Sequence, residues 1–257
     1  MNNFTKIIGI DPGMSKASTV CMLNDKNEIV IKDYSHDELR ILLDENAKGK
    51  EKVLICWDAP LTGIGEPNKS NDYLRNDFTQ RKIEQFFSRQ DYGYKTPKGI
   101  SVLGYGGCPH WTISQHMLGY PIMGRFQTQL EDLPYKLLHS EEELSKYNKL
   151  LVEVHPAVAL WMWISKTFKI WNYKKDNERL QTFVNELFVN EKSRIIENLK
   201  IPKITTDDEL DALITFLLGY FLINEPKKVM ILGNNETGSF LLPFDKDCKS
   251  SFERHKI

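Results

Sequence analysis

Short apolar runs, separated by turn-forming residues, recur along the first sixty residues in a pattern typical of β-strands. Runs over 6–10, 17–23 and 28–33 predict three strands in antiparallel succession. A helix is expected next, because Ser35 and Glu38 have the spacing of a capping box and leucines follow at helical spacing. The almost wholly apolar run over 53–57 is typical of a buried parallel strand.

The next ninety residues have a different character, with loops rich in Gly, Pro and Asn around an expected helix over 71–89 and a helical patch over 111–118. Long connections in compact domains are usually lids or binding elements. We therefore expect a single domain over 1–257, with an insertion over about 62–148 that covers the site.

A fifth strand is predicted over 150–154, and Pro156 opens a helix that is expected to carry Trp161, Trp163, Phe168 and Trp171. An amphipathic, lysine-rich stretch follows over 166–203. A very apolar helix over about 208–224 and a hairpin formed by 229–232 and 240–242 complete the chain.

Composition narrows the class of protein without identifying it. The 257 residues are 41% hydrophobic and 27% charged, with a formal net charge of -1, so the protein is not basic overall, although a local basic face is compatible with this balance. No apolar run approaches the ~20 residues of a membrane span, and no signal-peptide pattern precedes the first strand. The four cysteines form no CxxC pair. A cytoplasmic protein without a membrane partner is expected.

Carboxylates stand at the ends of apolar runs. Asp11 ends the first strand, Asp58 follows the fourth, and Glu153 interrupts the fifth. Asp208 and Asp211 are three residues apart at the start of the apolar helix, so one helix face presents both. Each acid alone has a structural explanation as a turn former or helix cap. An acid within buried elements, however, needs a cation beside it.

If these acids converge, they form a site for a divalent cation. Hard oxygen ligands without Cys or His at ligand spacing favour Mg²⁺ or Mn²⁺ over Zn²⁺. Two such ions bridging a scissile phosphate would activate water and stabilise the leaving oxygen. The glycine-rich run over 104–107 lacks the strand and the Lys-Ser/Thr of a phosphate-binding loop, and no Ser or Cys has a nucleophile-elbow context.

Several short motifs occur in one order along nearly the whole chain: Gly9-Ile10-Asp11, Asp58-Ala59-Pro60-Leu61, Arg75-x-Asp77-x-x-x-Arg81, Glu153-Val154-His155-Pro156-Ala157, Asp208-Glu209-Leu210-Asp211-Ala212-Leu213 and Gly238-Ser239-Phe240-Leu241-Leu242-Pro243. In this ordered set the chain resembles domain-of-unknown-function family 429, regarded as predicted RNase H-like nucleases. It departs from the family at His155, where an aromatic residue is usual, and in a longer middle region.

The resemblance implies an α/β fold with an RNase H-like five-stranded mixed sheet, the first three strands antiparallel, flanked by helices. As in Holliday-junction resolvases, acids from the first strand, the fourth strand and a late helix would form the site. Carried over to this chain, the resemblance implies metal ligation by Asp11, Asp58, Asp208 and Asp211, with Glu153 as a further catalytic candidate. Arg75 and Arg81 would clamp a substrate phosphate.

The leading hypothesis is a Mg²⁺- or Mn²⁺-dependent nuclease acting on DNA or RNA by a two-metal mechanism. One alternative is a nucleotide-binding phosphotransferase, because sugar kinases and actin-like ATPases share this sheet and begin with a strand that ends in Asp-x-Gly. The chain is only one such domain long, and it shows no second phosphate-binding hairpin. A non-catalytic binding module with the same fold is the third reading. Resolvase-like enzymes are often dimers, which makes a homodimer one option.

Overall fold

The computed structural model describes residues 4–13, 16–61, 81–92, 94–97, 100, 102, 134–164, 173–175, 177–190, 194–234 and 237–255. The expectations for Arg75, Phe168, Trp171, the 104–107 run and the 111–118 patch lie outside these residues.

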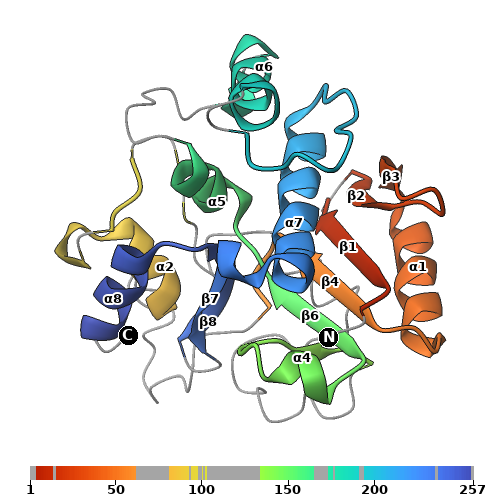
Figure 1. Ribbon diagram of the computed structural model, residues 1–257, viewed down its shortest axis with the longest axis horizontal. Coiled ribbons are helices and arrows are strands. Elements are labelled where there is room, and N and C mark those ends of the chain that lie inside the picture. Colours follow the sequence, from red (N-terminus) through yellow and green to blue (C-terminus); the bar gives the residue numbers. More distant parts are fainter. Residues whose placement is uncertain are drawn as a thin grey trace.

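A six-stranded mixed sheet, in the order β3-β2-β1-β4-β6-β5, forms the centre of the described chain (Figure 1). The first three strands, β1 (Lys6–Asp11), β2 (Ser18–Leu23) and β3 (Ile29–Tyr34), run antiparallel to one another. Strands β4 (Val53–Trp57) and β6 (Lys149–Glu153) extend the sheet in parallel with β1. The α/β class and the RNase H-like arrangement are as predicted, and β6 is the expected fifth strand.

The sixth strand, β5 (Lys136–Leu137), is only two residues long and pairs in parallel with the outer side of β6. A pair of residues carries no periodicity, so the hydrophobic pattern did not indicate it.

Two helices cover opposite faces of the sheet. Helix α1 (His36–Lys48) begins with the predicted capping box of Ser35 and Glu38, and its Leu39 and Leu43 pack with Ile8, Ile10 and Trp57. The apolar helix α7 (Asp207–Asn224) belongs to the larger hydrophobic core on the other face. A second capping box, between Thr206 and Glu209, starts α7. Figure 1 shows α7 lying along β1.

Gly9 lets α7 approach β1 unusually closely. A Cβ at this position would lie 2.3 Å from the backbone N of Phe216 and 2.7 Å from the backbone O of Ala212. Both contacts are with backbone atoms, so a larger residue would require the helix itself to move. The absence of a side chain at Gly9 thus sets the helix close to the strand, two residues before Asp11.

The hairpin formed by β7 (Val229–Asn234) and β8 (Gly238–Pro243) was predicted and is confirmed. Helix α8 (Lys246–Arg254) follows it, and η7 (Pro226–Lys228) precedes it. Within the expected insertion lie α2 (Lys82–Ser88), η3 (Gln90–Tyr92) and α4 (Glu143–Lys146). Helix α2 packs against β8.

Two helix expectations are wrong in their extent. The helix predicted over 71–89 does not pass through Arg81, whose backbone is extended at φ -68° and ψ 165°, so α2 begins at Lys82. The helix opened by Pro156, α5 (Pro156–Trp163), ends at Trp163. The lysine-rich stretch contains the short η5 (Tyr173–Lys175) and the helix α6 (Asn177–Val184), which continues directly into the π-helical turn η6 (Asn185–Val189). Tertiary contacts rather than amphipathic spacing set these boundaries.

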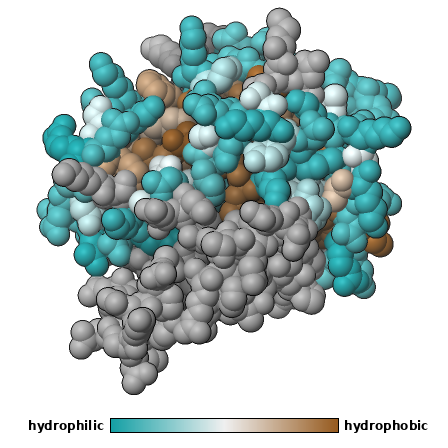
Figure 2. Space-filling view, turned by 90° about the horizontal axis from the view of Figure 1, so that it is seen from below, coloured by the Kyte–Doolittle hydropathy of each residue, from teal (hydrophilic) through white to brown (hydrophobic). Residues whose placement is uncertain are grey.

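Among the described helices, none is long and apolar enough to cross a membrane. On the face shown in Figure 2, hydrophilic side chains dominate the described surface, and apolar ones lie recessed between them.

Candidate functional site

Strand register places two of the predicted acids side by side. Ile10 pairs with Trp57 across the parallel strands β1 and β4, and the Asp58 backbone N–H donates to the Ile10 carbonyl at 3.0 Å. Asp11 and Asp58 therefore leave the sheet at the same carboxyl edge. Asp211 lies in the first turns of α7 and is 1% exposed. Gly9 has no side chain, and this allows α7 to pack close to β1.

The charges of these acids act on one another. Burial, and after it the charge of Asp211, raises the pKa of Asp11 well above its usual value. Burial also raises the pKa of Asp58, with the charges of Asp11 and Asp211 as the next causes. Desolvation and like-charge repulsion both disfavour the ionised forms of Asp11 and Asp58. A positive charge close to these carboxylates would therefore stabilise their ionised forms.

Two lysines supply positive charge. The Lys174 Nζ lies 2.6 Å from Oδ2 of Asp211, and the Tyr173 hydroxyl donates to Oδ1 of the same carboxylate at 2.5 Å. Lys16, in the connection between β1 and β2, pairs with Asp208 at the rim. The Asp211 charge raises the pKa of Lys174, which keeps that ammonium group protonated.

The donor set fits a hard divalent cation, although its present arrangement does not form a metal cage. Asp11, Asp58, Asp208 and Asp211 offer only carboxylate oxygens, which are the ligands that Mg²⁺ and Mn²⁺ prefer. In the part of the chain that the structure describes, no group of three Asp, Glu, His or Cys side chains is arranged to hold a metal ion. Instead, the ammonium group of Lys174 pairs with Asp211, and that of Lys16 pairs with Asp208.

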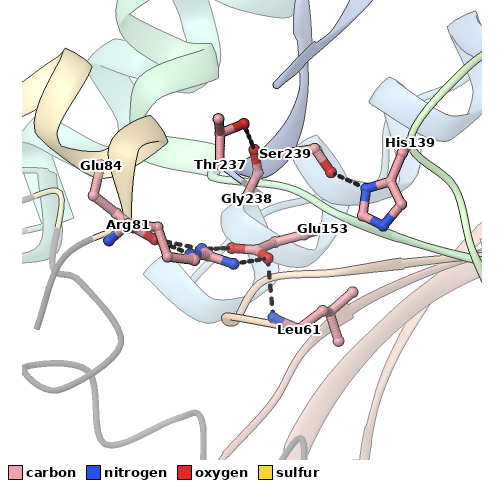
Figure 3. Close-up of polar contacts among 8 residues, drawn as sticks. All are labelled: Leu61, Arg81, Glu84, His139, Glu153, Thr237, Gly238 and Ser239. Carbon is pink, nitrogen blue, oxygen red and sulfur yellow. Dashed lines mark hydrogen bonds and ion pairs between the residues drawn. The ribbon is translucent and has the colours of Figure 1, made fainter. Parts of the chain in front are cut away.

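Glu153 and Arg81 form a separate buried ion network with Glu84 (Figure 3). The Arg81 guanidinium donates to Oε2 of Glu153 from Nη1 at 2.8 Å, to Oε1 from Nη2 at 2.5 Å, and to Oε1 of Glu84 from Nε at 2.7 Å. Oε2 of Glu153 also accepts from the Leu61 backbone N–H at 2.9 Å. The network therefore joins β6, the start of α2 and the segment that follows Asp58.

The partners of Glu153 and Arg81 suit a positioning role. Both oxygens of Glu153 accept hydrogen bonds, and the Arg81 side chain is 1% exposed between two carboxylates. Burial raises the pKa of Glu84 to about 7, opposed by the nearby charge of Arg81. The catalytic role predicted for Glu153 and the phosphate-binding role predicted for Arg81 stay predictions.

The hydrophobic pattern did not single out Tyr173, Lys174, Lys16 or Glu84. Tyr173 and Lys174 belong to a lysine-rich stretch that is typical of a solvated face. Glu84 lies three residues after Arg81, at the spacing of a helical ion pair, which is the one local signal available for this group.

The model of a family described as "Protein of unknown function (DUF429)" matches residues 124–236. The matched region contains Glu153, Asp208 and Asp211, together with the turn that carries Lys174, whereas Asp11 and Asp58 precede it. No curated protein and no solved structure matches the chain.

Proposed function

We propose that this protein is a Mg²⁺- or Mn²⁺-dependent nuclease that hydrolyses phosphodiester bonds of DNA or RNA. The observation that carries the proposal is that Asp11 at the end of β1, Asp58 directly after β4 and Asp211 in α7 lie near one another. Burial and the charges of neighbouring acids raise the pKa of Asp11 and of Asp58. A neutral side chain would pack at these positions without that electrostatic cost. Strongly perturbed carboxylates that share one place are typical of functional sites.

In this proposal, Asp11, Asp58 and Asp211 hold the divalent ions, and Asp208 completes the ligand set from the rim. Bound ions would supply an activated water and stabilise the charge on the leaving oxygen. The chain's own residues orient the ligands. Tyr173 holds one oxygen of Asp211, and Glu153 holds the Leu61 N–H and so fixes the segment that carries Asp58.

The test is cleavage of a panel of labelled oligonucleotides in Mg²⁺ or Mn²⁺. The panel contains single-stranded and duplex DNA, single-stranded RNA, an RNA–DNA hybrid and a four-way junction. We expect wild type to cleave at least one substrate, and Asp11→Asn and Asp211→Asn to lose at least ~100-fold in rate. Asp44→Asn, which neutralises an exposed acid on α1, is the matched control and should cleave like wild type.

Equal cleavage by wild type and Asp11→Asn would assign the activity to a contaminant or to other residues, and would contradict the proposal. The same holds for a wild-type protein that cleaves nothing in the panel and shows no binding of Mn²⁺.

A second candidate, a nucleotide-dependent phosphotransferase, draws support from the position of Lys16. This half-exposed lysine follows the Asp11-Pro12-Gly13 turn and lies next to Asp208, where an ammonium group could reach a nucleotide phosphate. A rise in melting temperature with Mg²⁺ and ATP, in a protein that cleaves no oligonucleotide, would favour this candidate.

A further inference from the structure

The two carboxylate oxygens of Asp211 have different partners, one of which is buried and the other half-exposed. Oδ1 accepts from the hydroxyl of Tyr173, which is 3% exposed and whose ring packs against Phe183 with centroids 5.2 Å apart. Oδ2 is paired with Lys174, whose side chain is 52% exposed although its ammonium group reaches the acid. Tyr173 is thus held by the core, whereas Lys174 has solvent beside it into which it can turn.

Lys174 also compensates the charge of the whole acid group. Its positive charge lowers the pKa of both Asp11 and Asp58, opposing burial and the charges of neighbouring acids. An ammonium group carries one positive charge and three donors, so it satisfies carboxylates electrostatically but coordinates nothing. A divalent ion at the same carboxylates would bring twice the charge and would repel the ammonium group.

We propose that Lys174 is a built-in counter-cation that occupies Oδ2 of Asp211 until a divalent ion displaces it, while Tyr173 holds Oδ1 throughout. This inference rests on the proposed metal-dependent function and concerns the regulation of the same site. The metal-free protein keeps its acids compensated through Lys174. Metal binding selects the state with Lys174 turned to solvent, so Lys174 lowers the apparent affinity for metal.

A merely structural ion pair would behave in the opposite way. If Lys174 only helped to order Asp211, its removal would loosen the carboxylate and weaken metal binding. A competing cation, once removed, leaves Oδ2 open and strengthens metal binding. The sign of the change in metal affinity therefore separates the two roles.

The experiment measures Mn²⁺ binding by isothermal titration calorimetry for wild type and Lys174→Met, without any substrate. We expect the Kd of Lys174→Met to fall by about tenfold or more, because an adjacent unit charge acts strongly at a partly buried site. Lys228→Met is the matched control. Lys228 is 47% exposed in a 2.8 Å ion pair with Glu225, which belongs to the end of α7 far from its acids, and its loss should leave Kd unchanged.

Tyr173→Phe gives a contrast of sign within the same turn. It removes the donor to Oδ1 without opening Oδ2, so its Kd for Mn²⁺ should rise or stay constant, never fall with that of Lys174→Met.

A second measurement uses the wild-type chain and so does not depend on a variant that folds. Lysines are acetylated with a small amine-reactive ester, and the rate at each site is followed by mass spectrometry. Saturating Mn²⁺ should raise the rate at Lys174 several-fold, because its ammonium group is released to solvent, whereas the rate at Lys228 stays constant.

Each combination of results has a separate meaning. Tighter Mn²⁺ binding by Lys174→Met than by wild type, together with faster acetylation of Lys174 in wild type at saturating Mn²⁺, supports the inference. Wild-type binding with an equal or higher Kd for Lys174→Met, or no change in acetylation at Lys174, overturns the inference and leaves the proposed function standing. Absence of Mn²⁺ binding in both proteins overturns the metal site, and the inference with it.

Discussion

Replacing Arg81 by Met tests whether the buried network supports the carboxyl edge of the sheet. Met fills much of the volume of Arg81 but supplies no charge and no donor, so Glu84 and Glu153 lose their shared cation. Both carboxylates are nearly inaccessible, with side-chain exposures of 1% and 5%, so water cannot replace the guanidinium. The change leaves two buried carboxylates without their positively charged partner.

The expected cost follows from this geometry. Removing one partner of a buried ion pair costs about 3–5 kcal/mol, because the remaining charge is left uncompensated. Part of this cost can be avoided by protonation, which becomes less favourable by about 1.4 kcal/mol per pH unit above the usual range of a carboxyl group. We therefore expect Arg81→Met to lose about 2 kcal/mol at low pH, near 5.5, and about 4–5 kcal/mol near pH 8.5.

Urea denaturation at these two pH values, followed by far-UV circular dichroism, measures the difference in the free energy of unfolding. Arg40→Met is the control, because Arg40 makes an exposed pair with Asp37 on α1, and its removal should change stability by less than ~0.5 kcal/mol at either pH. The triple variant Arg81→Met/Glu84→Gln/Glu153→Gln should recover most of the loss near pH 8.5, since it leaves no buried charge.

A loss below ~1 kcal/mol that is the same at both pH values would refute this reasoning. It would mean that Glu84 and Glu153 reach solvent, and that the network does not hold the segment after Asp58.

Three further changes test the packing and charge of the site. Gly9→Ala should destabilise the protein by about 1–3 kcal/mol or more, because its Cβ would overlap backbone atoms of Phe216 and displace α7. Chemical denaturation measures this loss, and a free energy of unfolding within ~0.5 kcal/mol of wild type would contradict the prediction. Burial raises the pKa of Glu84 from its ordinary value of 4.5 to about 7 in the folded protein. Between these two pH values the native state holds a proton that the unfolded chain releases. The contribution of this proton to stability is therefore lost as pH rises from 4.5 to 7. Glu84→Gln should flatten that decline, which melting temperatures at half-unit pH intervals will show. Asp11→Asn should melt a few degrees higher than wild type in metal-free buffer near pH 8. Burial and the charge of Asp211 raise the pKa of Asp11, so its ionised form is unfavourable in the native state. An unchanged or lower melting temperature would contradict this prediction.

The sequence by itself determined the local elements of this protein. The capping box of Ser35 and Glu38, the apolar run of β4 and the β7–β8 hairpin involve neighbours in the chain, whose spacing reports directly on helix starts, buried strands and turns. The same spacing placed Asp11 and Asp58 at the ends of strands, and parallel pairing of those strands brought them together.

Only the tertiary structure decided which partners the charged side chains take. Arg81 binds Glu153 across 72 residues and Tyr173 reaches Asp211 across 38, and no periodicity encodes such distances. The lysine-rich pattern around Lys174 is typical of a solvated face, whereas the fold places its ammonium group against Asp211. The resemblance implied a phosphate-binding role for Arg81, which stays a prediction, and the fold pairs Arg81 with Glu153 and Glu84. The physical reason is that a short-range pattern reports which face of an element is apolar. The partner of a charge depends on which elements the whole core brings into contact, such as α7 on β1 through Gly9.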